Sequence, residues 1–120
     1  MDVTSGTRTA FVTGATSGIG LAVTQSLARQ GVRVFGCSRN AENVASMVKQ
    51  LREDGLDVAG AACDVTAPDQ IHDAVAAAAS RWGAIDILVN AAGRNGGGET
   101  ATITDDLWLD VLATNLTGVF

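Results

Sequence analysis

The segment Thr13–Gly20, T-G-A-T-S-G-I-G, has the composition of a loop that binds phosphate. Gly14 permits a tight turn, Gly18 lets the backbone approach a pyrophosphate, and Gly20 allows a following helix to pack closely on a sheet. The N–H groups at the start of that helix are then available to an anion. Glycines also serve ordinary turns, so the prediction requires a strand before the segment and a helix after it.

A second candidate site lies about twenty residues further on, at Ser38 and Arg39. NAD-binding sites place a carboxylate there to hold the ribose hydroxyls, but this sequence has none before Glu42. The guanidinium of Arg39 suits a 2′-phosphate, with Ser38 as a supporting donor, so the sequence favours NADP(H). The alternatives are a surface arginine without a ligand and an Arg39 that interacts with Glu42.

Short β-rich runs alternate with helical stretches along the chain, as in parallel sheets with helical crossovers. The predicted strands are Thr9–Thr13, Arg33–Ser38, Val58–Cys63 and Ile85–Asn90. The predicted helices are Ile19–Gln30, residues 41–54, a helix capped by Thr66 with Pro68 in its first turn and ending near Trp82, and a last one from Thr104 to Phe120. Gly31, Gly55 and Gly83 are expected to end the first three.

This order predicts an α/β, Rossmann-type doubly wound sheet with the first four strands in the order 3-2-1-4. Residues 1–120 are expected to be the N-terminal part of a single dinucleotide-binding domain, because such domains normally need more chain. The fourth strand would be an edge although its sequence is apolar, so a fifth strand is expected beside it.

The spacing G-x-x-x-G-x-G resembles that of the short-chain dehydrogenase/reductase family, and the resemblance covers the whole chain. It includes Cys63-Asp64-Val65, Asn90-Ala91-Ala92-Gly93 and Asn115, although N-N-A-G is commoner than N-A-A-G. The resemblance implies that Asp64 contacts adenine, that the loop after Asn90 lines the cofactor, and that Asn115 has a catalytic role in holding a proton-relay water. The expected cofactor-binding residues are Gly14, Thr16, Ser17, Gly18, Ile19, Gly20, Ser38, Arg39, Asp64, Val65, Asn90, Ala91 and Gly93.

Three of these residues also have a structural interpretation. Asp64 is well suited to cap the turn after a strand, and Asn90 to be an ordinary turn residue. Asn115 stands in an apolar periodic stretch, where a poor helix former is also explained by a local bend.

The glycine-rich loop and the last helix are most similar to those of aromatic (type II) polyketide ketoreductases. In those enzymes a Pro-Gly-Gly segment steers the substrate, and the matching residues here are Asn95, Gly96 and Gly97. The resemblance implies an NADPH-dependent ketoreductase of antibiotic biosynthesis that reduces a polyketide ketone on an acyl carrier protein and forms a homotetramer. The alternatives are a 3-oxoacyl-[acyl-carrier-protein] reductase and a nucleotide-binding fragment without turnover.

The family's reaction uses Ser, Tyr and Lys, but the chain has no Tyr, and its only Lys, Lys49, is in the second predicted helix. Carbonyl reduction needs a proton donor near the nicotinamide, and no residue here is a clear candidate. His72 is expected to be exposed in mid-helix. Asp105 and Asp106 are best explained by the dipole of the last helix.

Composition narrows the remaining possibilities. With 47% hydrophobic residues the chain has enough apolar surface for a core, and its net charge of −5 disfavours nucleic acid and anionic membranes. No apolar run is long enough to span a bilayer, so the expected location is the cytoplasm. Cys37 and Cys63 are expected to be buried thiols, and no Cys/His cluster has the spacing of a metal site.

Overall fold

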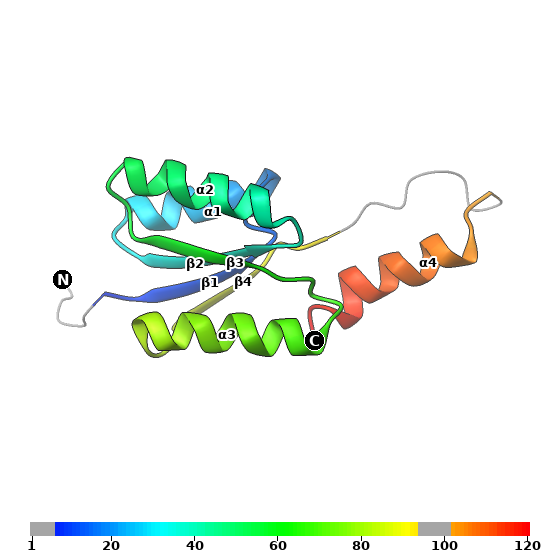
Figure 1. Cartoon of the computed structure of the whole chain (residues 1–120). Coiled ribbons are helices and arrows are strands. Elements are labelled where there is room, and N and C mark those ends of the chain that lie inside the picture. Colours follow the sequence, from blue (N-terminus) through cyan, green and yellow to red (C-terminus); the bar gives the residue numbers. More distant parts are fainter. Residues whose placement is uncertain (1–6, 94–101) are drawn as a thin grey trace.

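The computed structural model describes residues 7–93 and 102–120 (Figure 1). Within these ranges the elements are β1 (Thr9–Thr13), α1 (Gly18–Arg29), β2 (Arg33–Ser38), α2 (Ala41–Glu53), β3 (Val58–Ala62), α3 (Pro68–Trp82), β4 (Ile87–Asn90), α4 (Asp105–Leu112) and the π-helical segment η1 (Ala113–Thr117).

All three strand pairs are parallel, and the sheet has the order β3-β2-β1-β4, which confirms the predicted Rossmann-type topology. Helices α1 and α2 cover one face of the sheet and α3 covers the other (Figure 1). Because the strands are parallel, their carboxyl ends lie along one edge of the sheet, where the loops that lead to the helices also meet.

The core has two parts, one on each face of the sheet. Val12, Val34 and Val58 pack with Met47 and Leu51 of α2 on one face. On the other face, Phe11 and Phe35 stack with ring centroids 5.6 Å apart and pack with Cys37, Ala74 and Ala78, among others. Consecutive strand residues thus alternate between the two helical layers, which fixes the register of β1 at the centre of the sheet.

Several element boundaries differ from the sequence prediction. Helix α3 has Ala67 at its N-cap, so the prediction of Thr66 as the cap is wrong; Thr66 instead bonds to Asp64. Strand β3 ends at Ala62, one residue before the predicted end. Strand β4 begins at Ile87, two residues after the predicted start at Ile85. Ile85 instead packs against the core on the α3 side, and the Asp86 carboxylate accepts a hydrogen bond from the Thr9 N–H.

The last helix is not a single α-helix to Phe120 as predicted. Its α-helical part ends at Leu112, five residues of π-helix follow, and a turn begins at Gly118. The side chain of Thr104 accepts a hydrogen bond from the Leu107 N–H, which confirms the predicted start. Asp105 and Asp106 occupy the first turn, as the helix dipole favours.

Strand β4 is an edge of the described sheet, and its Leu88 side chain is 61% exposed. Apolar side chains of α4 and η1, including Trp108, Leu109 and Leu116, are also more than half exposed. Within the described ranges no helix is long and apolar enough to cross a membrane.

Candidate functional site: a cleft at the carboxyl edge of the sheet

A cleft of about 370 Å³ opens where the loops after β1, β2, β3 and β4 meet. It is lined by Gly14, Thr16, Ser17, Gly18, Ile19, Ser38, Arg39, Cys63, Asp64, Val65, Ala91, Ala92, Gly93 and Thr114. Segments that are up to 100 positions apart in the sequence therefore form one concave site. Eleven of the thirteen residues expected at the cofactor lie in this lining.

The glycine-rich turn forms one wall of the cleft. Gly14 and Gly18 have φ values of 62° and 52°, a region that disfavours residues with a Cβ. A Cβ on Gly18 would meet no atom within 4 Å, so the backbone there faces open space. Gly18 therefore leaves room for a group to lie directly against the turn.

Gly20 has a different role in the same turn. It is buried, and a Cβ at this position would overlap the carbonyl oxygen of Gly14 and approach the Ala91 side chain at 3.2 Å. Gly20 is not part of the cleft lining. It lets the first turn of α1 pack against the loop after β1, which agrees with the packing role predicted for it.

The N-terminus of α1 lacks the two local features that usually neutralise a helix start. Ser17 is the N-cap residue, but its side chain makes no capping hydrogen bond, and the first turn contains no acidic residue. The first N–H groups of an α-helix have no partner within the helix. With Ser17 and Gly18 in the cleft lining, these donors and the positive end of the helix dipole are available to an anion.

The loop after β4 is held in place by Thr13. Its Oγ1 accepts hydrogen bonds from the backbone N–H groups of Ala91 and Ala92, at 3.2 and 3.1 Å. Both loop residues line the cleft, and Thr13 ends the strand that carries the glycine turn. Thr13 thus fixes the distance between two walls of the cleft, a role that the sequence analysis missed because it depends on strand pairing.

Asp64 and Arg39 bring opposite charges to the third wall. The carboxylate of Asp64 accepts hydrogen bonds from the Thr66 hydroxyl and backbone N–H, at 2.7 and 2.9 Å. These two hydrogen bonds, and then the positive charge of Arg39, lower the pKa of Asp64 below its ordinary value of 3.8. Asp64 therefore caps the turn after β3, as the structural interpretation of this residue predicted. Asp64 also lines the cleft.

The remaining expected residues lie outside the cleft lining. Asn90 lines a different, mostly apolar cavity on the α3 side of the sheet, together with Phe11, Ile71 and Val119. Asn115 lies in η1, and a Cβ on Gly93 would be 3.4 Å from its Oδ1, so the side chain reaches the rim of the cleft. Asn95, Gly96 and Gly97 fall outside the described residues.

The structure adds Cys63, Ala92 and Thr114 to the residues expected from sequence. Cys37 and Cys63 are free and buried, as predicted, and lie beside each other. Burial, and then the neighbouring Cys63 thiol, raise the pKa of Cys37 to about 12, so it is protonated at neutral pH. Such thiols serve as small apolar side chains, and a protonated thiol is a poor nucleophile.

The geometry suits binding of a long anionic ligand. The lining of the cleft includes the first residues of α1, with their free N–H groups and glycine backbone, and also Arg39. His72 is exposed on α3, and it is not part of the cleft lining. Among the described residues there is no group of three His, Cys, Asp or Glu that could hold a metal ion.

Comparisons with known proteins agree with this architecture. The family model for short chain dehydrogenases matches residues 8–120. A ketoacyl reductase assigned to the granaticin polyketide synthase of Streptomyces violaceoruber is 60% identical over 92% of this chain and 41% of its own length. A gluconate 5-dehydrogenase of Gluconobacter oxydans is 40% identical over 97% of this chain and 45% of its own length.

Solved structures show the same relationship. A variant of actinorhodin polyketide ketoreductase, crystallised with NADPH, superimposes with a TM-score of 0.91 at 52% identity over 95% of this chain and 44% of that one. A gluconate 5-dehydrogenase from Burkholderia cenocepacia in complex with NADP and tartrate has a TM-score of 0.85 at 35% identity, over 94% of this chain and 44% of its own. The chain thus spans less than half the length of these relatives.

The predicted resemblance to polyketide ketoreductases is therefore confirmed by sequence and by fold. The match covers the glycine turn, the four strands and the cleft that they form. This chain belongs to the short-chain dehydrogenase family.

Proposed function

We propose that the chain is the NADPH-binding part of a ketoreductase that acts on polyketides. The observation that carries the proposal is the cleft itself, in which an uncapped helix N-terminus and Arg39 line the same space. Those two features match the two phosphate-bearing parts of NADPH, the pyrophosphate and the 2′-phosphate. When bound, NADPH supplies the hydride for carbonyl reduction.

Each wall of the cleft has a proposed task in holding the cofactor. The turn from Gly14 to Gly20, with Thr16, Ser17 and Ile19, binds the pyrophosphate through backbone N–H groups. Ser38 and Arg39 bind the 2′-phosphate, for which a guanidinium is a bidentate donor. Asp64 and Val65 lie against the adenine, and Ala91 and Gly93 line the nicotinamide half, while Asn90 supports their loop from outside the cleft.

Asn115 is proposed to be catalytic by holding a water that relays protons. Its support is the approach of Oδ1 to Gly93 and its position in a π-helical segment, because such segments occur often at functional sites. Asn95, Gly96 and Gly97 are proposed to contact the substrate. The sequence has no Tyr, so the general acid that the resemblance implies has no counterpart among residues 1–120.

The substrate class rests on the names of the relatives. The granaticin and actinorhodin proteins are both described as reductases of polyketide synthesis, and the chain shares 60% and 52% identity with them. A polyketide ketone is therefore the proposed substrate, and from the family resemblance we propose that it is tethered to an acyl carrier protein. We further propose a cytoplasmic homotetramer in which residues 1–120 form the N-terminal part of a single Rossmann domain.

The cofactor proposal is tested by titrating the purified protein with NADPH and NADH while Trp fluorescence is followed. We expect NADPH to bind more tightly than NADH. Arg39→Ala should lower the affinity for NADPH by about 10- to 100-fold, which corresponds to the loss of a hydrogen bond to a charged group. NADH affinity should change little, because NADH has no 2′-phosphate. Equal losses for both cofactors would contradict the role of Arg39.

Turnover is tested separately from binding. The intact mass of the native protein is measured, and NADPH oxidation is followed with a model bicyclic ketone. A mass near twice 12.2 kDa with ketone-dependent oxidation supports the reductase. NADPH binding without oxidation, at a mass of 12.2 kDa, would support a nucleotide-binding protein without turnover instead.

A further inference from the structure

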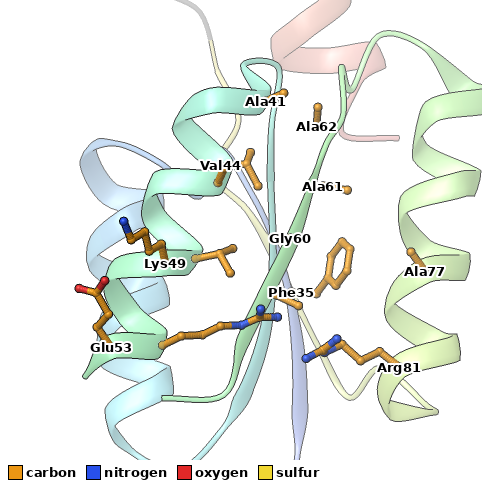
Figure 2. Close-up of a pocket in the computed structure, with 14 residues that line it drawn as sticks. Phe35, Ala41, Val44, Lys49, Glu53, Gly60, Ala61, Ala62, Ala77 and Arg81 are labelled. Carbon is orange, nitrogen blue, oxygen red and sulfur yellow. The ribbon is translucent and has the colours of Figure 1, made fainter. Parts of the chain in front are cut away.

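A second and larger hollow lies away from the cofactor cleft, along the free edge of β3. It has a volume of about 830 Å³ and lies between α2 and α3. Figure 2 shows Val44 and Lys49 on the α2 side, Ala77 and Arg81 on the α3 side, and the strand with Gly60 between the two helices. We call this hollow the β3-edge groove.

The backbone of β3 retains hydrogen-bonding capacity on the side of this groove. The parallel ladder to β2 uses the carbonyl of Asp57 and the N–H of Cys63, among others. Because alternate residues point their backbone groups to opposite sides, the N–H and C=O groups of Gly60 and Ala62 point to the free edge. The Val58 carbonyl also does, and it accepts a hydrogen bond from Arg52 Nε at 2.8 Å.

The side chains along the groove leave room for another backbone. The strand contributes Ala59, Gly60, Ala61 and Ala62, all of which are small. Gly60 lets α2 pack closely on the strand, because a Cβ there would lie 2.8 Å from Val44. Small residues at an edge strand let a neighbouring backbone come within the 4.7–4.9 Å spacing of paired strands, about the distance needed for hydrogen bonds.

The groove is also more basic than the rest of the molecule. Lys49, Arg52 and Arg81 line it against a single acid, Glu53, in a chain whose net charge is −5. Arg52 donates to a carbonyl, and the Arg81 guanidinium lies 5.2 Å from the centre of the Trp82 ring, so neither contact neutralises its charge. In Figure 2, Arg81 extends from α3 toward the strand. A partner with negative charge therefore complements this surface.

We propose that the β3-edge groove binds an acidic, extended peptide segment of a partner protein, which adds to the sheet as a strand beside β3. The backbone of the segment pairs with Gly60 and Ala62, and its acidic residues face Arg81, while Lys49 adds positive charge on the α2 side of the groove. Peptide recognition by strand addition gains affinity from such main-chain hydrogen bonds and specificity from the flanking side chains. The proposal does not depend on the function of the cofactor cleft.

Binding is measured by fluorescence anisotropy with labelled peptides of about seven residues, in which Val and Thr alternate and two Asp residues stand at one end. The protein is used in the form that its host makes. Two such peptides are compared, one with the Asp residues at the N-terminal end and one with them at the C-terminal end. We expect one to bind more tightly than the other, and this preference gives the direction of the added strand. A peptide with Lys in place of Asp, and one N-methylated at alternate residues, should bind at least tenfold more weakly.

Two variants test the groove, and the charge variant has a matched control. Lys49→Glu combined with Arg81→Glu should lower the affinity for the Asp peptide by about tenfold or more, because two exposed attractions become repulsions. Arg8→Glu combined with Arg29→Glu makes the same change in net charge at exposed sites elsewhere and should have little effect. Ala62→Pro removes an outward N–H without touching the ladder to β2, and edge strands tolerate proline.

The outcomes are distinct. The proposal is supported if the Asp peptide binds and both groove variants weaken it while NADPH affinity and the melting temperature stay close to those of the parent. It is overturned if no peptide binds, or if both charge variants weaken it equally. It is also overturned if the Lys49→Glu and Arg81→Glu protein forms dimers through this edge, since the cations would then only protect the edge from self-association.

Discussion

Helices α1 and α2 both begin at the carboxyl edge of the sheet, but their N-termini are built in opposite ways. At α2, the side chain of Asn40 accepts a hydrogen bond from the Asn43 N–H at 2.9 Å, and Glu42 stands in the first turn. At α1, Ser17 makes no capping bond, and no acid follows it. The N-terminus of α2 is stabilised by its own side chains, whereas that of α1 is not.

At one edge of the sheet, the N-terminus of α2 is therefore built for stability and that of α1 for binding a ligand. Capping residues and first-turn acids each stabilise a helix by roughly 1 kcal/mol, so their absence needs a reason. Their absence at α1 coincides with two positive-φ glycines and with the lining of the cleft. Local rules tend to fail at functional sites, and α1 lacks both the cap and the first-turn acid, whereas α3, which also lacks a side-chain cap, has Asp69 in its first turn.

The largest effect is expected from Gly20→Ala, which fills the contact between α1 and the preceding loop. In an ordinary helix this change is stabilising, but here the Cβ would overlap the Gly14 carbonyl oxygen. We expect a loss of about 3 kcal/mol in the free energy of unfolding, measured by urea denaturation. Gly31→Ala is the control, because Gly31 has a φ of 88° with open space around it and should lose about 1 kcal/mol. Equal losses would mean that crowding at Gly20 is unimportant.

The next effect is expected from Ser17→Asp, which gives α1 the cap and the charge that α2 has. The melting temperature should rise by a few degrees, while NADPH affinity should fall by about tenfold or more, because the carboxylate occupies the N–H groups and repels phosphate. Ser17→Asn supplies a neutral cap and separates these two causes. An unchanged NADPH affinity in Ser17→Asp would show that the phosphate does not bind at this helix.

The reverse change at α2, Asn40→Ala, should cost about 1 kcal/mol of stability. NADPH affinity should stay within about twofold, since the Asn40 side chain is committed to the Asn43 N–H. Thermal unfolding and NADPH titration of the same sample measure both quantities. A large loss of NADPH affinity here would remove the distinction between the two helix ends.

The smallest effect concerns Asp64, whose pKa is lowered first by its hydrogen bond with the Thr66 hydroxyl. A carboxyl with a lowered pKa stabilises the folded state when ionised. Its contribution is therefore present above the unfolded value of 3.8 and is lost as the pH falls through the folded value. Urea midpoints between about pH 5 and pH 2.5 should fall less steeply in Asp64→Asn and in Thr66→Val than in the parent. An identical pH profile in all three proteins would contradict the assignment.

Much of the fold was predictable because its signals are local. The alternation of apolar strands with helices gave the order β3-β2-β1-β4, and the glycine spacing placed the turn at Gly14 to Gly20. The cleft followed in large part from one rule, that the carboxyl ends of parallel strands share an edge. Residues that follow each strand directly, such as Arg39 and Asp64, could therefore be brought together from sequence.

The parts that were missed depend on contacts between distant segments. Thr13 reads as an ordinary strand residue until β4 brings Ala91 and Ala92 within reach of its hydroxyl. Thr66 is a residue type that often caps helices, but its hydroxyl donates a hydrogen bond to the Asp64 carboxylate, and α3 starts at Pro68. The β3-edge groove likewise has no motif, since its lysine and arginines come from two helices that only the folded sheet brings together.

The central position of β1 also has a consequence for the order of folding. Its pairing with β2 joins Thr9 to Arg33, whereas its pairing with β4 involves residues 77 or 78 positions apart, such as Thr9 and Asp86. Closing the longer loop costs more chain entropy, and contacts of high sequence separation slow folding. The first three strands can thus assemble before β4 docks, and the wall of the cleft that Thr13 anchors is expected to form last.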